Sequence, residues 1–166
     1  MSSNRVNVTA TLGGRLSRSQ IRTLAAVLKH ADHVAVGNGP LARPGSHEFG
    51  QGFREEMFEE AHREGTPIHA VALDCRHGVW SRLREAIVTL GLEASFHNEQ
   101  GANFEEGIER IAADGSVTEV AVWRGEPSRS LSELRDALAK GRALVDIVTE
   151  MEADLPQPVP PLELVP

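Results

Sequence analysis

Apolar and polar positions along the chain follow two periods, one typical of strands and one typical of helices. Segments that are apolar at every second position, or without a break, predict strands over residues 6–10, 33–36, 68–73, 94–97, 117–123 and 142–148. Segments that are apolar at every third or fourth position predict helices over residues 17–31, 53–64, 77–90, 103–113 and 130–140. Strands joined by helices require crossover connections, which favours a mainly parallel sheet.

The alternating order predicts an α/β fold. We expect a doubly wound, mainly parallel sheet of five to six strands with helices on both faces, which is a Rossmann-like arrangement. The final strand, residues 142–148, is predicted from a β-branched run that follows Gly141. A single helix that continues through Gly141 to Met151 is the alternative, and the cost of about 1 kcal/mol for a glycine inside a helix disfavours it.

The C-terminal segment departs from this pattern. Five of the nine prolines of the chain lie in residues 156–166, which predicts an extended tail over residues 153–166 after a single domain over residues 1–152. The tail is also richer in apolar side chains than a hydrated tail requires. Two interpretations remain open: a disordered end, or a segment that packs on a neighbouring subunit or in the groove of a partner.

Composition narrows the class of protein. The 166 residues carry 17 basic and 24 acidic side chains, and this acidic balance argues against broad nucleic-acid binding. The single cysteine excludes an internal disulfide framework and is typical of a cytoplasmic protein. The chain has no apolar run long enough to span a membrane and no apolar core of a signal peptide near its start, so we expect a cytoplasmic protein without membrane contact.

The first candidate site follows the first strand. Gly13 and Gly14 precede the first predicted helix, where free amides and the positive helix end favour an anion, and Arg15 adds a phosphate donor. The alternative is an ordinary tight turn between strand and helix.

The second candidate site is the long polar loop over residues 38–52, which follows the second strand. Its ligand-binding candidates are Gly37, Asn38, Gly39 and His47, and Glu48 is a ribose ligand or a general base. Asp74, at the end of the third strand, is a further candidate for ribose hydroxyls. A loop whose polar side chains are simply hydrated is the alternative.

The third candidate site follows the strand over residues 117–123. Arg124, Ser128 and Ser130 precede a helix and suit phosphate, and Glu133 lies one turn into that helix. Ser130 and Glu133 also have the spacing of a helix capping box, which is the structural alternative. The seven histidines and the single cysteine show no metal-ligand spacing, so no metal and no cofactor are expected.

Taken together, these segments resemble a family. Residues 13–15 (GGR), 34–39 (VAVGNG), 52–73 (GFREEMFEEAHREGTPIHAVAL) and 127–133 (PSRSLSE) resemble, in layout, the nucleotide-binding Rossmann-like superfamily of LOG-type phosphoribohydrolases (lysine-decarboxylase-like proteins) and DprA-like proteins. The resemblance implies nucleotide binding, and it places Glu133 where the hydrolases have a catalytic glutamate.

The leading hypothesis is therefore a protein that binds a nucleotide or nucleoside phosphate at the carboxyl edge of a parallel sheet. If it is an enzyme, we expect hydrolysis of an N-glycosidic bond, with Glu48 or Glu133 positioning water. A related hypothesis is a nucleoside deoxyribosyltransferase-like enzyme with Glu48 as nucleophile. A hypothesis from another class is a non-catalytic assembly or interaction protein that uses its long loop and proline-rich tail, with a homodimer as the favoured oligomer.

Overall fold

The computed structural model describes residues 5–37, 52–76, 80–98, 106–124, 126–155 and 157–166, with side chains from residue 7 onward except those of residues 73–76. These residues form eight strands and five helices. In chain order the elements are β1 (Arg5–Ser17), α1 (Ile21–Leu28), β2 (His33–Val36), α2 (Glu56–Glu64), β3 (Ile68–Arg76), α3 (Ser81–Leu90), β4 (Glu93–Asn98), β5 (Gly107–Ile111), β6 (Val117–Trp123), β7 (Glu126–Pro127), α4 (Leu131–Ala139), α5 (Leu144–Ala153) and β8 (Leu162–Val165).

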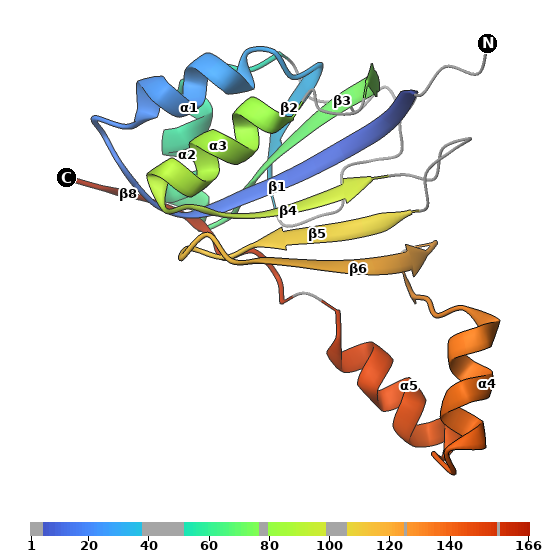
Figure 1. Ribbon diagram of the computed structural model, residues 1–166. Coiled ribbons are helices and arrows are strands. Elements are labelled where there is room, and N and C mark those ends of the chain that lie inside the picture. Colours follow the sequence, from blue (N-terminus) through green and yellow to red (C-terminus); the bar gives the residue numbers. More distant parts are fainter. Residues whose placement is uncertain (1–4, 38–51, 77–79, 99–105, 125, 156) are drawn as a thin grey trace.

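The sheet is antiparallel, so the predicted doubly wound, mainly parallel Rossmann-like sheet is wrong. Its strands lie in the order β2-β3-β1-β4-β5-β6-β7, and every pairing along this path is antiparallel. The last strand, β8, pairs with the end of β1 and is parallel to it. Helices α1, α2 and α3 lie together on one face of the sheet, not on both faces (Figure 1).

For α1 and α3 the crossover argument fails only in which strands become neighbours, whereas α2 connects β2 to β3, which are antiparallel neighbours. Strands β1 and β2, which α1 connects, run the same way because both are antiparallel to β3, which lies between them. In the same way β3 and β4, which α3 connects, are both antiparallel to β1. Helices α1 and α3 therefore each join parallel strands that are not neighbours, as in split β-α-β motifs.

The hydrophobic core lies between this sheet and the three helices. Val8, Ala10 and Leu12 alternate along β1 and are buried against the helices. They pack with Leu24 and Leu28 of α1, and with buried side chains from α2 and α3. Helix α2 ends at Glu64, and the left-handed backbone of the next residue, Gly65 (φ 63°), closes the helix.

Two predicted elements have a different structure. Residues 107–111 belong to the predicted helix over 103–113 but form β5, which pairs with β4 and β6. Residues 142–148 were expected as a strand, yet α5 begins at Leu144. The alternative of one continuous helix is also wrong, because Gly141 has a left-handed backbone (φ 79°) that separates α4 from α5.

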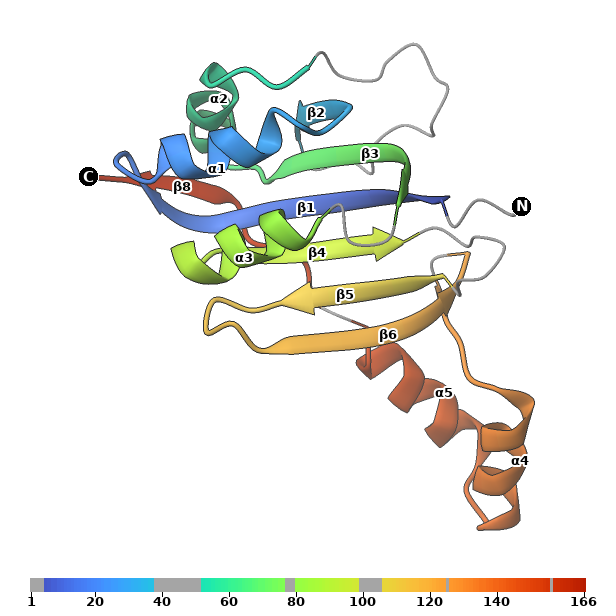
Figure 2. The same cartoon turned by 45° about the horizontal axis from the view of Figure 1, so that its top comes forward.

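Helices α4 and α5 form a hairpin that projects away from the sheet beyond β6 (Figures 1 and 2). From its end the chain returns to the sheet, where Leu162 and Leu164 of β8 are buried. Arg110 of β5 donates a hydrogen bond to the Gln157 carbonyl oxygen and supports the returning segment. The segment that the sequence predicts as a tail thus contributes a strand to the sheet of its own chain.

Candidate functional site

Gly13, Gly14 and Arg15 do not form the predicted phosphate-binding turn. They lie inside β1, which continues to Ser17. The Gly14 amide donates a hydrogen bond to the Pro161 carbonyl oxygen (3.0 Å), and Arg15 pairs in register with Glu163 of β8. The backbone amide that an anion would need is therefore already bonded to the C-terminal segment.

The predicted site after β2 is described in part. Asn38, Gly39, His47 and Glu48 lie outside the described residues. The carbonyl oxygen of Gly37 is bonded to the His69 ring, as set out below. Asp74 belongs to β3, and its side chain lies outside the described part of the structure.

The third predicted group is partly brought together. Ser128, Ser130 and Glu133 line one open groove of about 900 Å³ between β6 and the start of α4. Arg124 lies next to this groove, in a turn with a left-handed backbone (φ 54°), and its amide donates to a Glu106 carboxylate oxygen (2.8 Å). The register of the sheet separates this group from Gly13, since Gly13 pairs with the first residue of β4, whereas the groove lies toward the other end of that strand.

Ser130 and Glu133 form the capping box that the sequence offers as the structural alternative. The Ser130 hydroxyl accepts from the Glu133 amide (3.2 Å), and the Glu133 carboxylate accepts from the Ser130 amide (2.8 Å). Hydrogen bonds from the Ser130 hydroxyl and amide lower the pKa of Glu133. This carboxylate therefore starts a helix, and a lowered pKa is the opposite of what a general acid needs.

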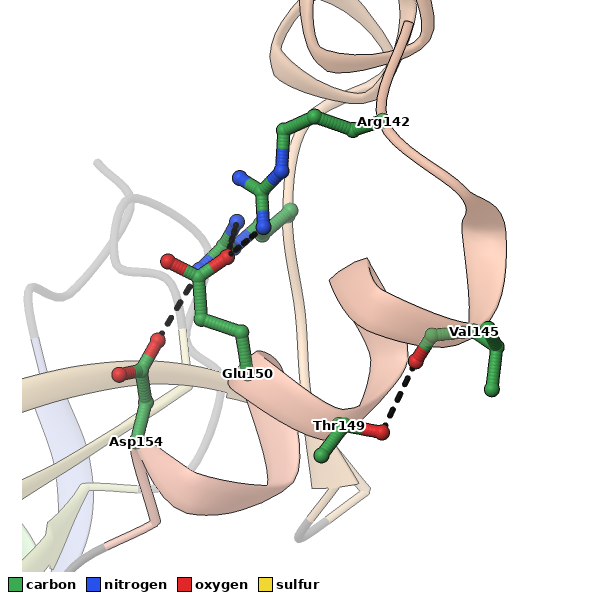
Figure 3. Close-up of polar contacts among 6 residues, drawn as sticks. Arg142, Val145, Thr149, Glu150 and Asp154 are labelled. Atoms are coloured by element: carbon green, nitrogen blue, oxygen red, sulfur yellow. Dashed lines mark hydrogen bonds and ion pairs between the residues drawn. The ribbon is translucent and has the colours of Figure 1, made fainter.

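Arg129 of the groove is held by carboxylates of α5. Its guanidinium contacts Glu150 (3.3 Å) and Asp154 (3.0 Å), and Arg142 donates to the same Glu150 oxygen (2.6 Å; Figure 3). Hydrogen bonds from Arg142 and then Arg129 lower the pKa of Glu150. The network joins the beginning of α4 to the end of α5. Because the Arg129 guanidinium is already paired with carboxylates in this network, its positive charge is not available to a phosphate.

A second polar group lies on the sheet face opposite the helices. The His69 ring of β3 is buried, with Nε2 2.8 Å from the Gly37 carbonyl oxygen and Nδ1 3.0 Å from the Thr11 hydroxyl. A carbonyl can only accept, so Nε2 donates and the neutral ring accepts from Thr11 at Nδ1. Burial lowers the pKa of His69 despite the bond to Gly37. His69 and Thr11 line a pocket of about 360 Å³ that the C-terminal segment covers with Leu155, Gln157, Pro158 and Val159.

The lowered pKa of His69 predicts acid sensitivity. Below the ordinary histidine pKa of 6.5, the unfolded chain binds a proton that the native state resists, so stability falls as pH decreases. We expect His69→Gln to flatten this dependence, whatever its effect at neutral pH. Urea unfolding between pH 5 and pH 8 measures it. Equal slopes for wild type and variant would contradict the prediction.

Reasoning from the sequence did not identify two features that bear on function. One is His69, whose signal is a histidine inside an otherwise apolar strand segment. The other is the exposed apolar surface of the α4–α5 hairpin, to which Leu131, Leu138, Leu144, Val145 and Val148 contribute.

Within the described part of the chain, no cluster of histidine, cysteine or carboxylate side chains could hold a metal ion. None of the described helices combines the length and apolarity needed to cross a bilayer.

Comparison of the chain with family models, with curated proteins and with solved structures finds no significant match. The resemblance to LOG-type and DprA-like proteins therefore stays a prediction from sequence layout.

Proposed function

We propose that this protein is a non-catalytic assembly protein that associates with a second copy of itself through the α4–α5 hairpin. One observation carries the proposal. Five large aliphatic side chains of the hairpin are between 45% and 71% exposed, whereas Ile147 is the one residue of the two helices that is fully buried.

The hairpin is poorly supported by its own chain. Isolated helices shorter than about 12 residues are marginal in water, and α4 and α5 have 9 and 10 residues. The capping box contributes about 1 kcal/mol, and the ion pairs around Glu150 contribute little, because water screens such pairs. Single apolar side chains are common on protein surfaces, but five on one short hairpin favour a covered surface.

A second copy of this chain suits the apolar surface of the hairpin better than an unrelated protein does. Two helical hairpins related by a two-fold axis form a four-helix bundle, in which the same apolar patch covers itself. Residues 129–154 carry four basic and six acidic side chains, so opposite charges are available across such an interface. The ten exposed aliphatic side chains of two hairpins contribute about 1 kcal/mol each, and an association cost of about 4 kcal/mol leaves about 6 kcal/mol, which predicts a dissociation constant on the order of tens of micromolar.

We expect the double variant Leu138→Glu with Val145→Glu to be monomeric at concentrations where the wild type is dimeric, because charges then occupy the apolar patch. Sedimentation equilibrium over a range of about 1 to 100 micromolar measures this. Val88→Glu is the matched control, since Val88 is similarly exposed (48%) but lies on α3. A wild type that stays monomeric throughout, or a variant that still dimerises, would contradict the proposal.

Nucleotide binding, N-glycosidic hydrolysis and deoxyribosyl transfer stay predictions, because Glu48 and its loop lie outside the described residues. The groove beside α4 gives them no support. The acidic residues Glu106, Glu133 and Asp154 line it, and their negative charge disfavours a phosphate. We also propose a cytoplasmic location, which the single cysteine favours.

A further inference from the structure

The outer edge of β6 is open over half of its length. Thr118, Val120 and Val122 face β5 along the ladder, so the amides and carbonyls of the alternating residues point outward. Strand β7 and the Ser128 amide cover this edge from Ala121 onward. Within the described residues, no strand pairs with the outward groups of Val117 and Glu119. An open strand edge is a template for another extended chain.

The groove of about 900 Å³ runs along this same edge. Residues 118–123 of β6 contribute to its lining on one side, and Ser128–Ser130, Glu133 and Asp154 contribute from the hairpin. A single strand laid against β6 would therefore lie between the sheet and the hairpin.

The charge of the groove is negative. Four acidic residues are among those that line it, namely Glu106, Glu119, Glu133 and Asp154. Among the described residues that line the groove, Arg129 is the basic one, and its guanidinium is already bonded to Asp154 and Glu150. A ligand that brings positive charge therefore gains attraction along the whole groove.

An exposed aromatic ring in the groove is a second feature that favours binding of a cation. Trp123 lines the groove and is 54% exposed. It lies four residues after Glu119 and so points to the same side of β6. The Arg124 guanidinium already lies 5.9 Å from the Trp123 ring centroid, which shows that a cation can reach this ring.

We propose that this groove binds an extended peptide segment of a partner protein, which adds as a strand to β6 and carries lysine or arginine side chains. Main-chain hydrogen bonds go to the outward groups of Val117 and Glu119, and a basic side chain of the added strand meets the Glu119 carboxylate. A lysine or arginine that follows the added strand, beyond the point where β7 covers the edge, meets the Trp123 ring. This partner goes beyond self-assembly through the hairpin, and its surface is separate, since neither Leu138 nor Val145 lines the groove.

A second copy of β6 is a poorer occupant. Antiparallel pairing of β6 with itself about Glu119 places two Glu119 carboxylates directly opposite each other, and like charges in that position are destabilising. The other carboxylates of the groove would also meet an acidic chain, since the net charge of the protein is −7. A basic segment of a different protein avoids both penalties.

The test uses the full-length protein and three short synthetic peptides with blocked ends, measured by fluorescence anisotropy. The probe is Lys-Val-Lys-Val-Lys, which can form a strand with its charges on one side. We expect it to bind at least tenfold more tightly than Lys-Pro-Lys-Pro-Lys, whose prolines lack amide donors, and than Glu-Val-Glu-Val-Glu. Equal affinity for both lysine peptides would mean that charge attraction alone causes binding, and this result would overturn strand addition. No saturable binding of the probe would overturn the proposal as well.

Substitutions in β6 test whether the peptide binds along this strand. Val117→Pro removes one outward amide while keeping the groove charge, and we expect about fivefold weaker binding of the probe. Glu119→Gln is expected to weaken binding about threefold and Glu119→Lys about tenfold. Glu85→Lys is the control with the same charge change at an exposed position of α3, and its affinity should equal that of the wild type. Equal effects of Glu119→Lys and Glu85→Lys would overturn the assignment to this groove.

Hydrogen exchange gives an independent measure of the site. The amides of Val117 and Glu119 should gain protection when the probe is bound. The hairpin variant Leu138→Glu with Val145→Glu should bind the probe like the wild type, so failure of the dimer and failure of the peptide site are separate results. Absence of added protection in β6 despite binding would overturn the proposal.

Discussion

Truncation after Ala153 is expected to lower the free energy of unfolding by on the order of 5 kcal/mol, a large fraction of the stability of an ordinary domain. The truncation removes β8, which buries Leu162 completely and Leu164 almost completely. Loss of each buried leucine costs about 2 kcal/mol or more, and the exposed core beneath them adds to this.

Backbone hydrogen bonds raise the cost of this truncation further. The amides of Gly14 and Arg18 bond to the carbonyl oxygens of Pro161 and Val165, and the Leu162 amide bonds to the Thr66 carbonyl oxygen. The Leu164 amide also bonds to the His62 ring. Removal of the segment leaves these partners in the retained domain unpaired, and buried groups among them carry a desolvation penalty.

Urea and thermal unfolding, followed by circular dichroism, measure the effect of the truncation. Glu163→Ala is the matched control, because Glu163 lies in the same strand with its side chain exposed, and its effect should stay within about 0.5 kcal/mol. An unchanged melting temperature after truncation would show that β8 does not stabilise the sheet.

Gly13→Ala is expected to destabilise the protein by several kcal/mol, because the added methyl group has no space. A Cβ at Gly13 would lie 1.7 Å from the Pro160 carbonyl oxygen and 2.9 Å from the carbonyl carbon. Both are backbone atoms, so the returning segment must move away from β1 and the β8 pairing is strained. Gly52→Ala is the control, since a Cβ there meets no atom within 4 Å.

The two changes should not be additive. In the chain truncated after Ala153, Pro160 is absent, so Gly13→Ala should cost much less than it does in the full-length protein. A double-mutant cycle of unfolding free energies measures this coupling. An equal cost of Gly13→Ala in both chains would mean that contact with the C-terminal segment is not the reason for a glycine at this position.

The sequence predicted local elements better than their arrangement. The segments over residues 6–10, 33–36, 68–73, 94–97 and 117–123 lie in strands, because alternation and β-branched content reflect local burial. Which strands become neighbours depends on pairing between distant residues, such as Leu12 with Ile68. A single sequence does not encode that choice in a local pattern, and the expectation of adjacent parallel strands was therefore wrong.

Local signals with two interpretations account for the remaining differences. The helix predicted over residues 103–113 is one such case, because Glu106 contacts the His97 ring of β4 (2.9 Å) and residues 107–111 form a strand. Gly13 and Gly14 suggested a turn for phosphate, but they are needed where the C-terminal segment crosses close to β1. A glycine pair in a sequence indicates a close approach of backbone but does not identify the segment that approaches.

The apolar excess of the tail left two interpretations open, a disordered end and a packed segment, and the structure has a packed segment. The two alternate positions Leu162 and Leu164 are buried and Glu163 between them is exposed, which is a strand pattern that the prolines obscured. The sequence proposed a neighbouring subunit or a partner's groove as the packing surface. The structure instead uses the end of β1 in the same chain.

The pairing of β8 with β1 has a consequence for synthesis. The first strand of the chain is completed by the last, so the leading residues leave the ribosome long before their final partner has been made. Closure of such a distant contact is slow relative to local hairpin formation. The sheet is therefore expected to reach its full stability only after β8 has been synthesised and has left the ribosome, and products that terminate before β8 are expected to lack this last stabilising step.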